Sequence, residues 1–104
     1  MEITITDQNF DEILKNNAVV MVDFGATWCG PCKQLAPVVE EIANDYAGRV
    51  AVGKADVEEC PDVTARFRIR NVPTVLFFKN GEVVDKSVGS VPKNTLTDKL
   101  NALL

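Results

Sequence analysis

Residues 18–33 read AVVMVDFGATWCGPCK, and this stretch decides the fold. Ala18–Phe24 is almost continuously apolar and rich in valine, which is typical of a parallel strand covered on both faces. Cys29 and Cys32 follow after a short turn, and Pro31 between them suits the first position of a helix, where its missing N–H has no partner to lose. The stretch therefore predicts a central strand that leads through a turn into a helix opening with two cysteines.

The rest of the chain alternates between strand and helix patterns. We expect further strands at Glu2–Thr6, Arg49–Asp56, Thr74–Lys79 and Glu82–Val88, and helices at Phe10–Asn17, Pro31–Gly48, Pro61–Phe67 and Pro92–Leu104. Asn80-Gly81 lies between the last two strands and is a strong signal for a tight hairpin. The order βαβαβαββα predicts an α/β fold, with a central mixed β-sheet flanked by helices on both faces.

Several residues mark the helix boundaries. Thr6 or Asp7 is a suitable N-cap for the first helix, and Gly48 is suited to end the second. Pro37 falls inside the second helix, where it should produce a kink. In the last helix one apolar face is predicted, formed by Leu96, Leu100, Leu103 and Leu104.

Length and charge limit the possible functions. The 104 residues predict one domain, 1–104, and the net charge of −4 comes from 15 acidic residues against 11 lysines and arginines. This balance argues against binding to nucleic acid or to an anionic membrane surface, because both need a basic face. No apolar run approaches the roughly 20 residues that span a bilayer, and residues 1–16 lack the features of a secretory signal. We therefore expect a cytoplasmic protein.

The two clustered cysteines favour redox chemistry over a structural role. The chain has only one other cysteine, Cys60, and no histidine, whereas a structural zinc site needs four ligands. A disulfide closing so short a loop would remove little entropy from the unfolded chain. Residues three apart share one side of a helix, at a Cα separation of about 5–6 Å that suits a disulfide. A metal site or a purely structural disulfide remains a disfavoured alternative.

The local sequence around each cysteine predicts a different role for its thiol. Unpaired N–H groups and the helix dipole should lower the pKa of Cys29, which we expect to be the more exposed and the attacking sulfur. Cys32, one turn later, should resolve the mixed disulfide that results. Cys60 lies in EECPD, where acidic neighbours disfavour a thiolate. We expect a passive thiol there, with a regulatory or intermolecular disulfide as the alternative.

Motifs spread over nearly the whole chain point to one family. They are VDFGATWCGPCK (22–33), Pro37, VGKADVEE (52–59), IRNVPTVLFFKNGE (69–82) and Val88-Gly89. In this order they make the sequence resemble the thioredoxin family. It departs from the family at Gly25, where many bacterial members have an aromatic residue and others a small one, so we expect looser packing beneath the site.

The resemblance implies a role for each matching residue. Cys29 would be the nucleophile and Cys32 the resolving cysteine. Asp23 would be a buried acid–base group behind Cys32, with Lys54 paired to it. Burial of a carboxylate in this apolar strand should also raise the pKa of Asp23. The resemblance further implies a cis Pro73 and a substrate-binding surface formed by Trp28, Gly30, Pro31, Val72, Pro73, Thr74, Gly89, Ser90 and Val91.

The resemblance also implies a function and its partners. The protein would be a monomeric protein-disulfide reductase that binds no cofactor of its own and receives electrons from NADPH through a flavin-containing thioredoxin reductase. Its substrates would be other proteins with disulfides. Gly30-Pro31 resembles the reducing members of the family, but an oxidant or isomerase is one alternative, because the residues between the cysteines tune the potential. A thioredoxin-fold binding module that acts regardless of redox state is the other.

Overall fold

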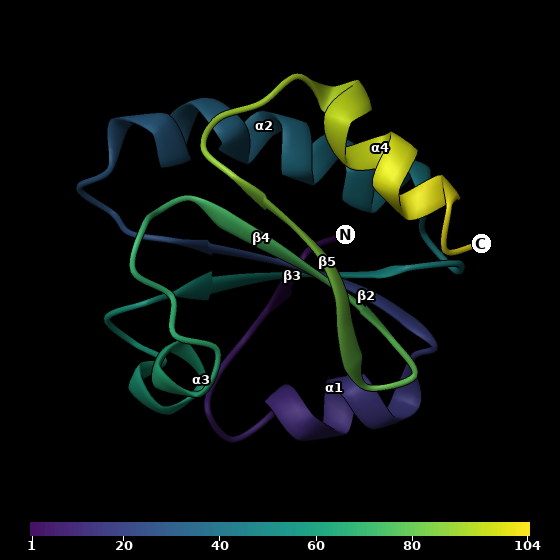
Figure 1. Cartoon of the computed structure of the whole chain (residues 1–104), viewed down its shortest axis with the longest axis horizontal. Helices are drawn as coiled ribbons and strands as arrows, with labels where there is room; N and C mark the ends of the chain where they lie inside the picture. Colours follow the sequence, from purple (N-terminus) through teal and green to yellow (C-terminus); the bar gives the residue numbers. More distant parts are fainter.

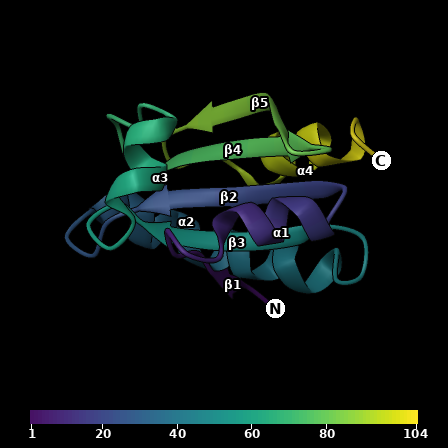
Figure 2. The same cartoon turned by 90° about the horizontal axis from the view of Figure 1, so that it is seen from below.

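A five-stranded sheet separates two layers of helices in the computed structural model, which describes residues 1–104 (Figure 1). The strands are β1 (Ile3–Thr4), β2 (Val19–Gly25), β3 (Ala51–Asp56), β4 (Thr74–Lys79) and β5 (Glu82–Val88). Their spatial order is β1-β3-β2-β4-β5 (Figure 2). Strands β1, β3 and β2 run parallel, whereas β4 is antiparallel to both β2 and β5. The predicted mixed sheet is confirmed, although β1 is shorter than expected and β3 begins two residues later.

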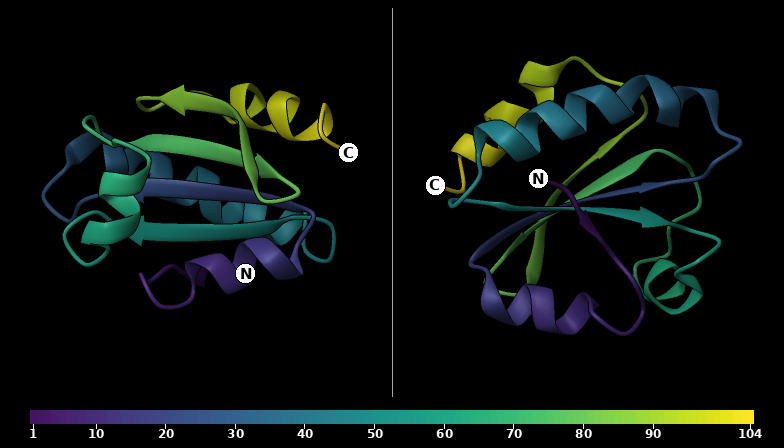
Figure 3. Two further views of the ribbon diagram at one scale, coloured as in Figure 1. Left: turned by 60° about the horizontal axis from the view of Figure 1, so that its bottom comes forward. Right: turned by 180° about the vertical axis from the view of Figure 1, so that it is seen from behind.

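Four helices cover the sheet in two pairs. They are α1 (Phe10–Asn16), α2 (Gly30–Asp45), α3 (Pro61–Arg66) and α4 (Lys93–Asn101). Helices α2 and α4 lie on one face, and α1 and α3 lie on the other (Figures 1 and 3). The element order βαβαβαββα therefore agrees with the sequence prediction.

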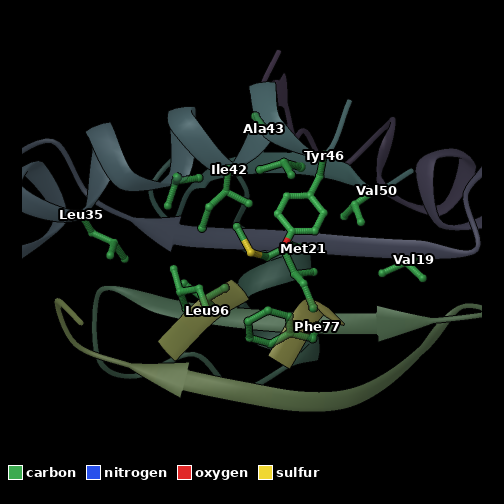
Figure 4. Packing of buried hydrophobic residues seen from close by; sticks show 13 residues of the cluster. Val19, Met21, Leu35, Ile42, Ala43, Tyr46, Val50, Phe77 and Leu96 are labelled. Carbon is green, nitrogen blue, oxygen red and sulfur yellow. The ribbon is translucent and has the colours of Figure 1, made fainter. Parts of the chain in front are cut away.

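Strand β2 lies at the centre of the sheet, and all of its residues are buried. Because side chains alternate along a strand, Val19 and Met21 pack under α2 and α4, whereas Val20, Val22 and Phe24 face α1 and α3. The core under α2 and α4 is shown in Figure 4; its 13 buried residues include Leu35, Ile42, Tyr46, Phe77 and Leu96. The apolar run is thus explained by helices on both faces of the strand.

The predicted hairpin forms between β4 and β5. Asn80 and Gly81 both have positive φ angles, 52° and 85°, as a two-residue turn of this type requires. The backbone N–H of Asn80 also donates a 2.8 Å hydrogen bond to the carbonyl of Ala18, which ties the turn to the start of β2.

Asn9 directly precedes α1 but makes no side-chain capping hydrogen bond to it, and of the two predicted caps Thr6 supplies the capping contact whereas Asp7 does not. Thr6 and Asn9 exchange two hydrogen bonds. The backbone N–H of Thr6 donates to the side-chain oxygen of Asn9 at 2.8 Å, and the backbone N–H of Asn9 donates to the hydroxyl of Thr6 at 3.0 Å. The Asp7 carboxylate instead accepts hydrogen bonds from the backbone N–H groups of Asp62 and Val63 in the first turn of α3. Asp7 therefore stabilises a helix that is distant in sequence.

Two helix ends also differ from the prediction. Helix α2 ends at Asp45, and Gly48, with a φ of 84°, belongs to the turn that follows. Helix α4 ends at Asn101, so Leu104 lies beyond it and is 57% exposed, unlike the buried Leu96. The glycine signal placed the end of α2 too late, because Gly48 belongs to the turn, and the apolar residues after Asn101 extended the prediction for α4.

Candidate redox-active site

The two cysteines lie where the chain leaves the carboxyl end of β2 and enters α2. Cys29 is the N-cap of α2, and it forms a disulfide with Cys32 across a Cα separation of 5.2 Å, within the predicted range. The backbone N–H of Cys32 donates to the sulfur of Cys29 at 3.1 Å. A negative charge on this sulfur would be stabilised by that N–H group and by the helix dipole.

Residue exposure does not distinguish the two cysteines, so the prediction that Cys29 is the more exposed one is wrong. Cys29 is 5% exposed and Cys32 8% exposed, because Ala26, Val57 and Val72 pack against the pair. Their surroundings differ instead. The Cys29 sulfur lies 3.7 Å from the carbonyl oxygen of Val72, on the loop before β4. The Cys32 sulfur lies beside Gly25 at the end of β2.

Asp23 is buried beside this pair on β2. It is 2% exposed, and its Oδ1 atom has no hydrogen-bond partner. Burial raises the pKa of Asp23 from 3.8 to about 6, because water no longer stabilises the charged form. The positive charge of Lys54 opposes this rise, and the negative charge of Glu2 adds to it. The burial and the direction of the pKa shift agree with the sequence analysis.

Lys54 is next to Asp23 but does not pair with it directly. The two residues are register partners on β3 and β2, so their side chains start on the same face of the sheet. Lys54 is nevertheless exposed, and neither an ion pair nor a hydrogen bond connects the two side chains. The expected direct pairing is therefore absent. A long lysine side chain can keep its ammonium group in water while still affecting a nearby carboxylate through space.

A cavity of about 230 Å³ connects the buried acid to the disulfide. Asp23, Gly25, Cys32 and Lys54 all line it. A Cβ atom built on Gly25 would lie 3.4 Å from the Cys32 sulfur, so a larger side chain there would extend into the space beside it. The looser packing expected at Gly25 stays a prediction.

The residues predicted to bind substrate divide into three groups. Trp28, at 68% exposure, is accompanied on the surface by Gly30, Pro31 and Ser90, while Val72, Gly89 and Val91 are half-buried. Pro73 follows a cis peptide bond, as predicted, and is itself buried. Thr74 is also buried, and its hydroxyl donates to the carbonyl of Asn71 at 2.6 Å, so its side chain does not form part of the exposed surface.

The sequence did not identify Glu2 as a charged neighbour of Asp23, and it did not show how deeply Cys60 is buried. Glu2 was not considered, yet its Oε2 atom is buried without a partner and its charge affects Asp23. Only the pairing of β1 with β3 brings it there, and no motif indicates this. Cys60 is fully buried, with its sulfur 3.1 Å from the carbonyl oxygen of Ile5. Its pKa is raised by burial and by the charges of neighbouring acids, which agrees with a passive thiol.

A disulfide that closes at the N-terminus of a helix, next to a buried carboxyl group, defines a thiol–disulfide oxidoreductase. The thioredoxin family model matches residues 1–102, and the chain belongs to this family. It acts as a disulfide reductase through the Cys29–Cys32 pair.

Three relatives illustrate the similarity. The chain is 50% identical to "Thioredoxin" of Staphylococcus haemolyticus, over 95% of its own length and 94% of that protein, and 50% identical to "Thioredoxin 2" of Chlorobaculum tepidum, over 92% and 89%. It is 48% identical to "Thioredoxin M-type, chloroplastic" of Spinacia oleracea, over 96% of this chain but only 56% of that protein. No helix is long and apolar enough to cross a membrane.

Proposed function

We propose that the reduced protein attacks disulfides of other proteins with the thiolate of Cys29. The observation that carries this assignment is the position of Cys29 as the N-cap of α2, where its sulfur accepts the N–H of Cys32. The thiolate forms a bond to one substrate sulfur, and the other substrate sulfur leaves as a thiolate and takes up a proton. The product of this step is a mixed disulfide between Cys29 and the substrate.

Cys32 completes the reaction from the inner side. Its thiol loses a proton, its sulfur attacks the Cys29 sulfur, and the first substrate sulfur leaves and is protonated. The substrate has then gained two electrons and two protons, and the protein holds the Cys29–Cys32 disulfide. Asp23 is suited to accept the proton of Cys32, because both line the same cavity and a pKa of about 6 leaves the carboxylate largely ionised at neutral pH. Lys54, on the wall of that cavity, would favour the ionised form.

The substrate peptide would bind across the surface around Trp28. The backbone carbonyl of Val72 lies beside the Cys29 sulfur. From this position the backbone of Val72 would pair with an extended peptide as a neighbouring strand does. Gly30, Pro31, Gly89, Ser90 and Val91 would complete this surface, with Pro73 and the backbone of Thr74 beneath it.

The remaining parts of the proposal concern the supply of electrons and the compartment. The protein would bind no cofactor, act as a monomer and be reduced again by a flavin-containing thioredoxin reductase that uses NADPH. A protein that must return to the dithiol form needs a reducing compartment, which supports the cytoplasm. One relative is named as chloroplastic.

Two experiments test the proposal. In the first, purified protein is equilibrated in thiol–disulfide buffers of stepped potential while Trp28 fluorescence is recorded, with Cys32→Ser as a control. We expect a two-electron transition at about −270 mV, the value established for thioredoxin. A midpoint of about −180 to −120 mV would identify an oxidant or isomerase instead. A protein that forms no disulfide at any potential would have to be a binding module.

The second experiment separates the two cysteines. Cys32→Ser should accumulate a mixed disulfide with a reducible protein substrate, whereas Cys29→Ser should not. The reverse pattern would show that Cys32 is the nucleophile.

A further inference from the structure

A basic hollow lies beside the redox site. Its volume is about 220 Å³, and it is lined by the loop after α3, by β4 and by β5: Phe67, Arg68, Ile69, Arg70, Asn71, Thr74, Leu76, Lys86 and Val88. Three of these residues are cationic and none is acidic, although the chain as a whole has a net charge of −4. The hollow therefore differs in charge from the rest of the molecule.

The three cations are not used inside the protein. Arg68, Arg70 and Lys86 are exposed, and none of their side chains forms an ion pair or a hydrogen bond. By contrast, Arg66 pairs with an acid on α1, and Lys93 pairs with two acids on α2. Three like charges around one hollow repel one another, and an anionic partner would remove this repulsion.

The hollow directly adjoins the backbone that faces the disulfide. Asn71 and Thr74 line it, and they flank Val72 and Pro73 on either side. The Val72 carbonyl oxygen lies 3.7 Å from the Cys29 sulfur. On the other strand, Val88 lines the hollow and precedes Gly89, whose N–H donates to the Pro73 carbonyl at 2.8 Å. A peptide that pairs with Val72 would therefore continue over the hollow within a few residues of its reacting cysteine.

We propose that this basic hollow binds acidic side chains in the segment that flanks the reactive cysteine of a substrate protein. The inference rests on the proposed function, because it assigns a preferred substrate class to the same site. Aspartate or glutamate at these flanking positions would meet Arg68, Arg70 and Lys86, whereas lysine would be repelled. Such contacts on an exposed surface act mainly on the rate of association and weaken as salt is added.

The test uses synthetic peptides with one internal disulfide that differ only on one side of a cysteine, which carries a run of aspartates, serines or lysines. The reduced protein is mixed with each peptide, and the single-turnover rate is followed by Trp28 fluorescence at low and high salt. At low salt we expect the aspartate peptide to react about fivefold faster than the serine peptide, and the lysine peptide more slowly than both. High salt should bring the three rates together.

Two variants with the same change in net charge locate the effect. Lys86→Glu should remove most of the preference for the aspartate peptide and leave the serine peptide unchanged. Lys15→Glu, on the exposed surface of α1, should leave the preference intact. Equal rates for all three peptides, or equal effects of the two variants, would overturn the proposal while the reductase function stands. A protein that reduces none of the peptides, the serine peptide included, would contradict the proposed function itself.

Discussion

Replacing the buried Asp23 with asparagine should stabilise the protein at neutral pH. In the folded state the pKa of Asp23 is raised from 3.8 to about 6, chiefly by burial. In the unfolded chain the carboxyl group returns to its ordinary value. At about pH 7 the ionised carboxylate is therefore less favourable in the folded protein than in the unfolded one. The difference between 3.8 and about 6, at about 1.36 kcal/mol per pH unit, is about 3 kcal/mol.

The sign of this effect gives a pH profile as well as a magnitude. Below pH 3.8 the carboxyl group is protonated in both states and costs nothing. Between 3.8 and about 6 the unfolded state releases its proton first, so the unfolded state gains stability as the pH rises. Above about 6 the loss is complete and constant. The wild-type protein should thus lose about 3 kcal/mol from this residue across that window, whereas Asp23→Asn should lose none of it.

Urea unfolding of the oxidised protein, followed by circular dichroism at several pH values, measures this difference. At about pH 7 the midpoint of Asp23→Asn should lie roughly 1–3 M above that of the wild type, and the two midpoints should converge near pH 4. Asp98→Asn, an exposed acid on α4, is the matched control and should shift neither the midpoint nor its pH dependence. A variant no more stable than the wild type at neutral pH would refute the assignment of a raised pKa to Asp23.

Three further predictions concern Glu2, Gly53 and Cys60. Glu2→Gln removes a negative charge that raises the pKa of Asp23, so carboxyl NMR should show that pKa at a lower value than in the wild type; an unchanged titration would contradict the coupling. Gly53→Ala places a Cβ atom 2.6 Å from the buried side chain of Ile5 and should lower the free energy of unfolding by about 1–3 kcal/mol in urea titrations; no loss would show that Ile5 moves freely. Cys60 should react with iodoacetamide only after unfolding, because it is fully buried, and rapid labelling of the folded protein would show that this part of the core opens.

Much of the fold follows from local sequence signals. The valine-rich run of β2 and the Asn80-Gly81 turn each specify one element through a strong local preference. The spacing of Cys29 and Cys32, together with Pro31, also sufficed to predict a redox pair at the start of a helix. These features depend on residues that are neighbours in the chain.

What the sequence did not show depends on contacts between distant segments. Asp7 caps α3 because β1 brings it there, and Glu2 reaches the surroundings of Asp23 for the same reason. The basic hollow forms because the loop after α3 and the edge strand β5 place Arg68 and Lys86 around the same space. The exposure of Lys54 was also not predictable, because its long side chain can place the ammonium group either beside Asp23 or in water.

The sheet places recognition and chemistry in different layers of the molecule. Because side chains alternate along a strand, Asp23 lies on the same face of β2 as Val19 and Met21 and so faces α2 and α4. Leu76 and Phe67, which help to line the basic hollow, pack instead in the core with α1 and α3. Substitutions of the exposed Arg68, Arg70 or Lys86 would change the charge of the hollow while leaving Asp23 and Cys32 in place. After a gene duplication, two copies of such a protein could diverge in the clients they serve while both keep the same reaction.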